Sequence, residues 1–206
     1  MTNKGKGRPE IVAAVILGVA TILAALVGIL YANSSKYSDL TLLDFAYKEE
    51  QLFPNCAFSG PSTYCGIQEN PLISSNQTVA ECISNKLYSD DTLIKLKPKS
   101  ILLSGYRRQI PNTGNRIEGV MLIAEEFDSS AKATLLYTYI SVIRRIEGVE
   151  PYVSAEFFRK GRIVLILASV EATIGTDDSF NLAGTNQSST LCFDRIKKLI
   201  RSTGEK

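Results

Sequence analysis

Histidine and tryptophan are both absent from the 206 residues of this sequence. Histidine is the commonest general base, the commonest zinc ligand and the side chain that titrates nearest to physiological pH. The chain also has no GxSxG elbow, no Walker A loop, no GxGxxG turn and no HExxH helix. We therefore expect a protein that is not an enzyme and that holds neither a metal ion nor a cofactor.

A large excess of charge is also missing, because 23 basic residues face 21 acidic ones and leave a net charge of +2. This balance gives no general attraction to nucleic acid or to an acidic substrate, so we expect no nucleic-acid partner. Repeats and low-complexity tracts are lacking too, and hydrophobic residues make up 45% of the chain. Such a composition is typical of a folded protein with a substantial core.

One stretch has no charged residue at all: residues 11–31, IVAAVILGVATILAALVGILY. As a helix with a rise of about 1.5 Å per residue, it would span roughly 31 Å, the thickness of a bilayer's hydrocarbon core. A buried helix of a soluble protein usually runs shorter and shows a polar edge. Tyr31 stands where an interfacial aromatic residue is expected. We predict a single transmembrane helix over residues 11–31.

The flanks of this stretch predict its orientation. Three basic residues crowd the short N-terminal side: Lys4, Lys6 and Arg8. Between Tyr31 and Lys48 the other side carries only two basic residues, Lys36 and Lys48, which Asp39 and Asp44 offset. The positive-inside rule then makes residues 1–10 a cytoplasmic tail and places the main domain outside the cell membrane. Signal-peptide cleavage within YANSS is the alternative, although the apolar stretch exceeds the usual 7–15 residues or so.

The segment KGKGRPEIVAAVILGVATIL resembles the start of archaeal type IV pilin-like proteins. It has a basic residue and a glycine, a short polar step, and then a long helix of Ala, Val, Ile and Leu. The resemblance implies that a peptidase cuts before the apolar helix and that these helices pack into a filament core. A cut after Gly7 would make Arg8 and Pro9 the first two residues of the mature chain. A cut after Gly5 would make the polar Lys6 its first residue and Glu10 its fifth.

The four cysteines all lie on the side that we expect to be outside: Cys56, Cys65, Cys82 and Cys192. An even count in that location favours two disulfides. The loop FPNCAFSGPSTYCG brings Cys56 close to Cys65 and predicts that they pair, which leaves Cys82 for Cys192. Free buried thiols are the alternative. A zinc site is disfavoured because there is no CxxC pair and no histidine.

Three glycosylation triplets also fall on the predicted outer side. They begin at Asn33, Asn76 and Asn186. Each triplet alone is a weak signal, but all three agree with the predicted topology. We therefore expect a glycoprotein.

Residues 32–99 predict helical segments on either side of the cysteine loop. The first is a juxtamembrane helix at residues 39–53. The second is a short helix at residues 78–88, which opens with a capping-box pattern formed by Thr78 and Glu81.

Residues 100–206 predict an α+β sandwich core. Strand patterns cover residues 100–110, 116–127, 152–159 and 162–172, and helix patterns cover residues 129–147 and 190–202. The last two strands flank Lys160-Gly161, a signal for a two-residue turn. The resulting ββαββα order favours one antiparallel sheet covered on one face by helices, in the neighbourhood of ferredoxin-like folds. This architecture by itself predicts no function.

Basic residues gather at the predicted hairpins. One group comprises Arg107, Arg108 and Arg116, and the other comprises Arg159, Lys160 and Arg162. If the two hairpin ends adjoin, these residues form an anion-attracting patch that could contact lipid headgroups, glycans or an acidic partner. The alternative, which we favour, is that they guard strand edges against unwanted pairing.

Pairs of neighbouring acids offer little catalytic chemistry. Glu125 and Glu126 lie on one strand and should point to opposite faces, with one of them in solvent. Asp177 and Asp178 lie in a polar loop that could hold Ca²⁺ through oxygen atoms, although a solvated loop is the favoured interpretation.

The sequence thus predicts a membrane-anchored extracytoplasmic domain with an interaction or structural role. It would serve as an accessory subunit or surface-assembly component without catalytic activity, and would contact another membrane or surface protein or associate with itself. A pilin-like filament subunit is the first alternative. A histidine-independent acid hydrolase, which would use Asp or Glu, is the second.

Overall fold

The computed structural model describes residues 36–52, 54, 56–59, 63–88, 93, 95–110, 116–147, 153–174, 180–182 and 191–205. Several sequence predictions fall outside these residues: the membrane span at 11–31, the pilin-like segment, Asn33, Asn186, Asp177 and Asp178. Among the residues that the structure does describe, no helix is both long enough and apolar enough to cross a bilayer.

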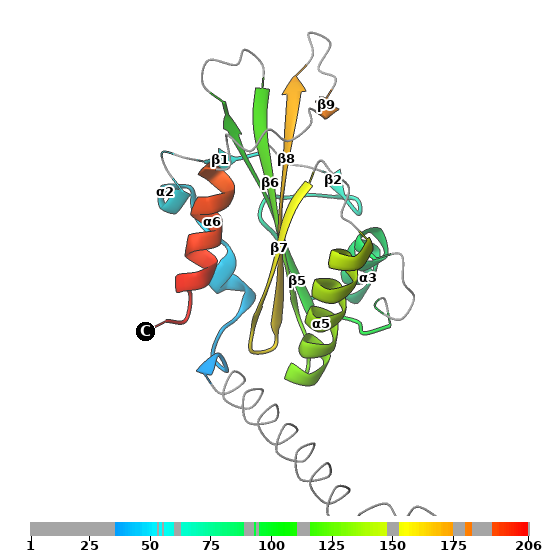
Figure 1. Cartoon of the computed structure of the whole chain (residues 1–206). Coiled ribbons are helices and arrows are strands. Elements are labelled where there is room, and N and C mark those ends of the chain that lie inside the picture. The colour runs from blue at the N-terminus through cyan, green and yellow to red at the C-terminus, as the bar shows by residue number, and fades with distance from the viewer. Residues whose placement is uncertain are drawn as a thin grey trace, which may run out of the picture.

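The domain is built on an antiparallel sheet in which the strand order is β1-β5-β6-β8-β7 (Figure 1). Two further strands extend this path, since β4 pairs with β5 and β9 pairs with β8. The strands are β1 Ala57–Phe58, β4 Leu72–Ser74, β5 Ser100–Gln109, β6 Arg116–Glu126, β7 Val153–Lys160, β8 Ile163–Ile174 and β9 Phe180–Leu182. A separate small hairpin consists of β2 Thr63–Tyr64 and β3 Ile67–Gln68. The antiparallel sheet and the mixed α+β class are therefore as predicted.

The long strands match their sequence patterns closely. Strands β5 and β6 pair along ten positions from Ser100↔Glu126 to Gln109↔Ile117. Strands β7 and β8 pair up to Lys160↔Ile163, so that Gly161 and Arg162 form the turn. The turn lies one residue later than the predicted Lys160-Gly161 pair because Lys160 still belongs to the ladder.

Helical segments of the described residues accompany the sheet: η1 Leu42–Phe45, α2 Glu49–Leu52, α3 Gln77–Leu87, α5 Ser130–Glu147 and α6 Leu191–Ser202. The continuous helix predicted at residues 39–53 is instead divided into η1 and α2. Helix α3 begins one residue before the predicted start, and its N-cap is Asn76, whose side chain accepts a hydrogen bond from the Thr78 backbone N–H.

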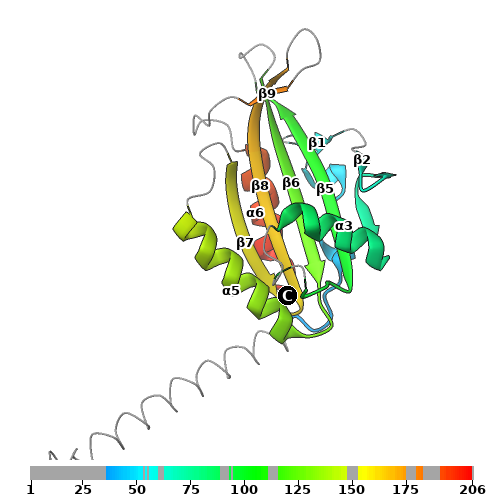
Figure 2. The ribbon, with the colours of Figure 1, turned by 90° about the vertical axis from the view of Figure 1, so that its right-hand side faces the viewer.

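Helices cover both faces of the sheet, which corrects the prediction of a single covered face (Figure 2). On one face, η1, α2 and α6 pack against sheet residues that include Leu102, Leu122 and Leu165. On the other face, α3 and α5 pack against residues that include Ile123 and Ile166. Because the central strands are apolar at consecutive positions, both of their faces need a cover.

All four cysteines form disulfides, but the predicted pairing is wrong. Cys56 bonds to Cys192 with a Cα–Cα distance of 5.2 Å, and Cys65 bonds to Cys82 with a Cα–Cα distance of 6.1 Å. Cys56 and Cys192 belong to the core on the α6 face, whereas Cys65 packs against the core on the α3 face. The sheet therefore stands between Cys82 and Cys192 and prevents the predicted bridge.

The observed pairing makes a prediction about stability. The Cys56–Cys192 bridge spans 136 residues and the Cys65–Cys82 bridge spans 17. Constraint of the unfolded chain should then contribute about 5 and about 3 kcal/mol, respectively. We expect Cys192→Ser to lower the unfolding free energy more than Cys65→Ser, as measured by urea unfolding of the full chain in detergent.

Double variants test the connectivity itself. Cys56→Ser/Cys192→Ser should be about as stable as Cys192→Ser alone, because both changes remove the same bond. The control Cys82→Ser/Cys192→Ser should be clearly less stable, because it removes two bonds. If this control instead matched the single variant, Cys82 and Cys192 would be partners and the structure would be contradicted.

Candidate functional site at the β7–β8 hairpin tip

A buried lysine marks the tip of the β7–β8 hairpin. Lys160 is only 7% exposed although its side chain is cationic. Its Nζ donates a hydrogen bond of 3.0 Å to the Arg201 carbonyl, at the C-terminal end of α6. A cation is favoured there because the carbonyl groups at the end of a helix carry partial negative charge. Glu205 Oε1, 3.9 Å from Nζ, adds a carboxylate.

The same ammonium group holds Tyr37. Lys160 Nζ lies 4.6 Å from the centroid of the Tyr37 ring and donates a 3.4 Å hydrogen bond to the Tyr37 hydroxyl. The ring face carries the negative part of the aromatic quadrupole, so it attracts the cation. The first residues that the structure describes are thereby joined to a hairpin more than one hundred residues later in the chain.

Two glycines leave space for Tyr37. Gly161 has φ +60°, and a Cβ there would lie 2.9 Å from the Tyr37 carbonyl oxygen. Gly204 has φ +78°, and a Cβ there would lie 3.0 Å from Tyr37 Cδ1. Both positions therefore favour glycine through backbone conformation and through close approach. We call Tyr37, Lys160, Gly161 and Gly204 the Tyr37 clasp.

Two neighbouring lysines change the pKa of the Tyr37 phenol. Burial opposes its ionisation, but hydrogen bonds and charge from Lys36 and Lys160 outweigh this effect and lower the Tyr37 pKa below its ordinary value. The clasp thus combines a polar contact with an aromatic one.

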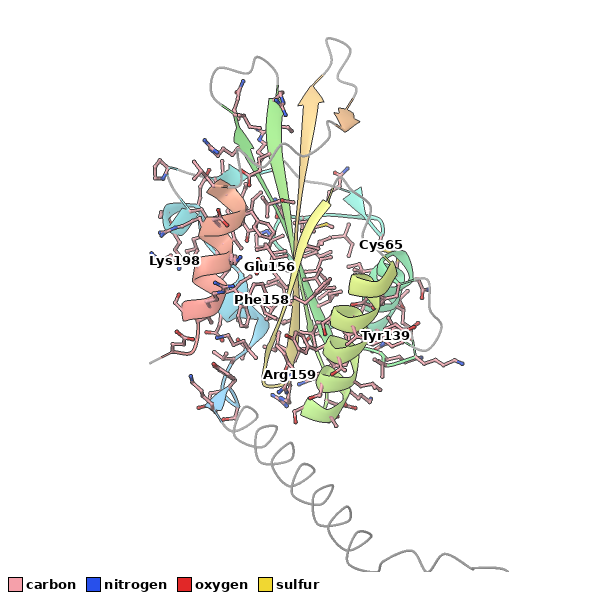
Figure 3. All side chains as sticks on the ribbon, in the orientation of Figure 1. Cys65, Tyr139, Glu156, Phe158, Arg159 and Lys198 are labelled. Carbon is pink, nitrogen blue, oxygen red and sulfur yellow. A yellow bond between two sulfur atoms is a disulfide. The ribbon has the colours of Figure 1, made fainter. Side chains whose placement is uncertain are left out.

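The two arginines of the tip have different surroundings. Arg162 Nη2 lies 3.4 Å from Glu126 Oε1, and the Ser100 hydroxyl donates a 2.9 Å hydrogen bond to Glu126 Oε2. Arg159 donates to the carbonyl of Gly161 and lies at the lower end of the sheet in Figure 3. Burial lowers the pKa of the Arg159 guanidinium, which remains a cation at physiological pH.

The second basic group lies far from the tip. Arg107 and Arg108 are in the part of β5 that pairs with Gly119 and Glu118, and Arg116 pairs with Thr173 near the end of β8. The tip instead adjoins Ile163, at the start of β8. Along the 12 residues of β8, the two ends are separated by roughly 36 Å. The two hairpin ends do not adjoin, so no joint patch forms, and anion binding by either group stays a prediction.

Arg108 is occupied by a structural contact. Its Nη1 lies 3.8 Å from Glu118 Oε2. Glu118 is 3% exposed and accepts backbone hydrogen bonds from Cys192 at 3.2 Å and Phe193 at 3.0 Å, in the first turn of α6. Burial raises the Glu118 pKa, although these bonds and Arg108 oppose the shift. Glu118 therefore caps α6 from the sheet.

Glu125 and Glu126 point to opposite faces, but neither meets solvent. Glu125 is 2% exposed and Glu126 is 9% exposed, so the expectation of one solvated acid is wrong. Glu125 accepts hydrogen bonds from the Ser84 hydroxyl at 3.0 Å and the Tyr88 hydroxyl at 2.7 Å. Burial raises the Glu125 pKa, and the two hydroxyls only partly offset this effect. Both oxygens of Glu125 thus serve to attach α3 to the sheet.

Two further kinds of candidate site are a glycosylation site at Asn76 and a metal site. Asn76 is exposed and uses its side-chain oxygen to cap α3, which leaves its amide nitrogen for a glycan, so glycosylation there stays a prediction. Within the described ranges, His, Cys, Asp and Glu side chains form no group of three or more that could hold a metal ion.

The sequence interpretation missed Tyr37 and Gly204 altogether. A glycine just after a helix is a known C-terminal signal, so Gly204 could have been noticed after the helix pattern at residues 190–202. Tyr37 gives no such signal, because its partner lies at the tip of a distant hairpin.

Glu125 should make stability depend on pH. Because its pKa is raised in the folded state, the folded protein binds a proton more tightly than the unfolded chain. Stability should therefore be highest below the ordinary Glu pKa and should fall as pH rises toward the folded pKa, by up to about 1.4 kcal/mol per pH unit. Glu125→Gln should reduce this fall in urea unfolding between about pH 5 and about pH 8.

A second variant gives the opposite change. Tyr88→Phe removes a hydroxyl that favours the ionised carboxylate, so the Glu125 pKa should rise further and stability should keep falling to a higher pH. An unchanged pH dependence in both variants would mean that Glu125 does not stay protonated in the fold.

A comparison with protein-family models, with curated proteins and with solved structures finds no match. The function is therefore inferred from the chain's own residues and their geometry.

Proposed function

We propose that this protein is a single-pass, membrane-anchored extracytoplasmic domain with an interaction or structural role and no catalytic activity. The observation that carries the proposal is the Tyr37 clasp. Tyr37 follows the end of the predicted span at Tyr31 by six residues, and it is built into the base of the folded domain. The folded domain therefore begins almost directly after the predicted anchor.

The disulfides support an extracytoplasmic location. Cys56–Cys192 and Cys65–Cys82 lie on opposite sides of the sheet, and each joins separate elements of the fold. Disulfides of this structural kind persist in oxidising compartments and are rare in the cytosol. This agrees with the orientation that the basic N-terminal flank favours.

The buried acids support a structural role over catalysis. Glu118 holds the first turn of α6, and Glu125 holds α3 through Ser84 and Tyr88. Both carboxyls are thus used within the fold.

The outer face of α5 supports the interaction role. Leu135 is 54% exposed and Val142 is 50% exposed. Ala131 precedes Leu135 on this face and Thr138 lies between Leu135 and Val142, and both are exposed. The four residues follow the alternating spacing of three and four positions that forms a helix–helix seam. Residues 133–143 contain no charge. A second copy tethered in the same membrane fits this face, because two uncharged seams meet without repulsion.

Topology can be tested with an impermeant thiol reagent on intact cells. The native cysteines are bonded, so a single engineered thiol should react alone. We expect Ser38→Cys to be labelled on intact cells and Thr2→Cys to be labelled only after permeabilisation, with the parent chain as the unlabelled control. The reverse pattern would contradict the orientation.

The mass of the native N-terminus tests the filament alternative. Loss of the first five or seven residues would favour a pilin-like subunit, whereas retention of residues 1–10 fits a plain anchor.

Self-association through α5 has its own test. Leu135→Glu/Val142→Glu places two charges in the seam and should convert a dimer of the full chain into a monomer, as counted by mass photometry in nanodiscs. Leu43→Glu is the matched control, because Leu43 is 71% exposed but belongs to η1. A monomeric parent chain, or a dimer lost only in the control, would overturn this part of the proposal.

A further inference from the structure

We propose that the clasp end of the domain is a docking surface for the anionic headgroups of the bilayer that holds its anchor. The inference rests on the proposed membrane anchor and assigns a ligand class to the hairpin tip. We define the clasp end as Lys36, Lys99, Arg159 and Arg162 together with the Tyr37 clasp.

These residues lie at one end of the sheet. The Lys99 N–H donates to the Glu126 carbonyl at 2.7 Å, and the Phe127 N–H donates to the Arg162 carbonyl at 3.0 Å. Lys99, immediately before β5, and Arg162, immediately before β8, are therefore separated by two strand spacings, or about 10 Å. Figure 1 shows the hairpin tip and the first described residues at this same end.

The clasp end has a surplus of positive charge. Its acids are mostly engaged: Glu126 by Arg162, Asp128 by Lys132 at 2.9 Å, and Glu205 by Lys160. Three cations have no carboxylate of the described residues within ion-pair distance: Lys36, Lys99 and Arg159. Asp39, whose carboxylate accepts from the Ser38 hydroxyl, is the acid that remains beside them.

The anchor keeps this surplus close to the membrane. Lys36 follows Tyr31 by five positions in the chain, which span at most about 17 Å when fully extended. The headgroup layer itself is roughly 5–7 Å thick, so Lys36 lies within about 10 Å of it. This distance is close to the Debye length at physiological salt. A loose linker would let the domain turn away, but the Tyr37 clasp fixes the tip next to Lys36.

Phosphodiester headgroups fit the side chains at this end. Lysine donates as a compact charge, and the Arg159 guanidinium offers a planar fork that matches two phosphate oxygens. Each cation near an anionic lipid surface should raise the ratio of docked to undocked orientations roughly fivefold. Several cations are thus enough to hold the tip against an acidic membrane.

The missing tryptophan makes a clean test possible, because one introduced indole is then the only one in the chain. Ser38→Trp places the reporter beside the tip, and Leu191→Trp places it at the start of α6, near Glu118 and far from the tip. The full chain is reconstituted into phosphatidylcholine vesicles with or without phosphatidylglycerol. Quenching by a lipid that carries a spin label on its headgroup then reports contact.

Docking predicts stronger quenching of the Ser38→Trp reporter when phosphatidylglycerol is present, and loss of this increase at high salt. Lys36→Gln, Lys99→Gln and Arg159→Gln should each lower the ratio of docked to undocked orientations roughly fivefold. Arg107→Gln, an exposed arginine at the other end of the sheet, is the matched control and should change nothing. The Leu191→Trp reporter should not respond to the lipid in any case.

Vesicle flotation distinguishes a missing docking surface from a missing membrane anchor. A chain that floats with pure phosphatidylcholine vesicles but shows no dependence on phosphatidylglycerol keeps its anchor and loses the docking surface. A chain that does not float with any vesicle refutes the anchor itself. Equal effects of Arg107→Gln and Arg159→Gln on the quenching would overturn docking through the tip. The salt titration of the parent chain tests docking even if a variant misfolds.

Discussion

The buried ammonium of Lys160 joins three parts of the chain that are far apart in sequence. It contacts Tyr37 among the first described residues, its own strand lies at the tip of the β7–β8 hairpin, and it donates to the last turn of α6. A buried cation without partners would be strongly unfavourable, so each of these contacts offsets part of the cost of burial. The arrangement at the base of the domain follows from these contacts.

The two faces of the sheet explain most of the remaining architecture. Strand β8 is apolar at consecutive positions over IVLIL, so it cannot leave one face in water. Helix α6 covers one face and α5 covers the other. Each disulfide then stays on its own side, and each buried glutamate attaches a different helix: Glu118 holds α6 and Glu125 holds α3. Covalent and polar links thus reinforce the same two layers.

The long elements were predictable because their periodicity is local. Strands β5, β6, β7 and β8 and helices α5 and α6 start and end within one or two residues of their sequence patterns. Short strands such as β1 and β4 were missed because two or three residues carry no period and form only by pairing with β5. The disulfide pairing and the Tyr37 clasp depend on which face or end of the sheet a residue reaches, and the sequence does not give this directly. The short spacing of Cys56 and Cys65 suggested the wrong pair because it reports proximity only along the chain. The membrane anchor remains a prediction of composition and charge.

The coupling between Tyr37 and Lys160 tests the central claim most directly. A double-mutant cycle of Tyr37→Leu and Lys160→Met, measured by urea unfolding of the full chain in detergent, isolates this pair. A desolvated cation–π contact together with a hydrogen bond predicts a coupling energy of about 1–2 kcal/mol. The cycle of Tyr37→Leu with Arg107→Gln, at the other end of the sheet, should be additive. Additivity of the Tyr37 and Lys160 changes within about 0.3 kcal/mol would show that the clasp does not join the start of the domain to the hairpin tip.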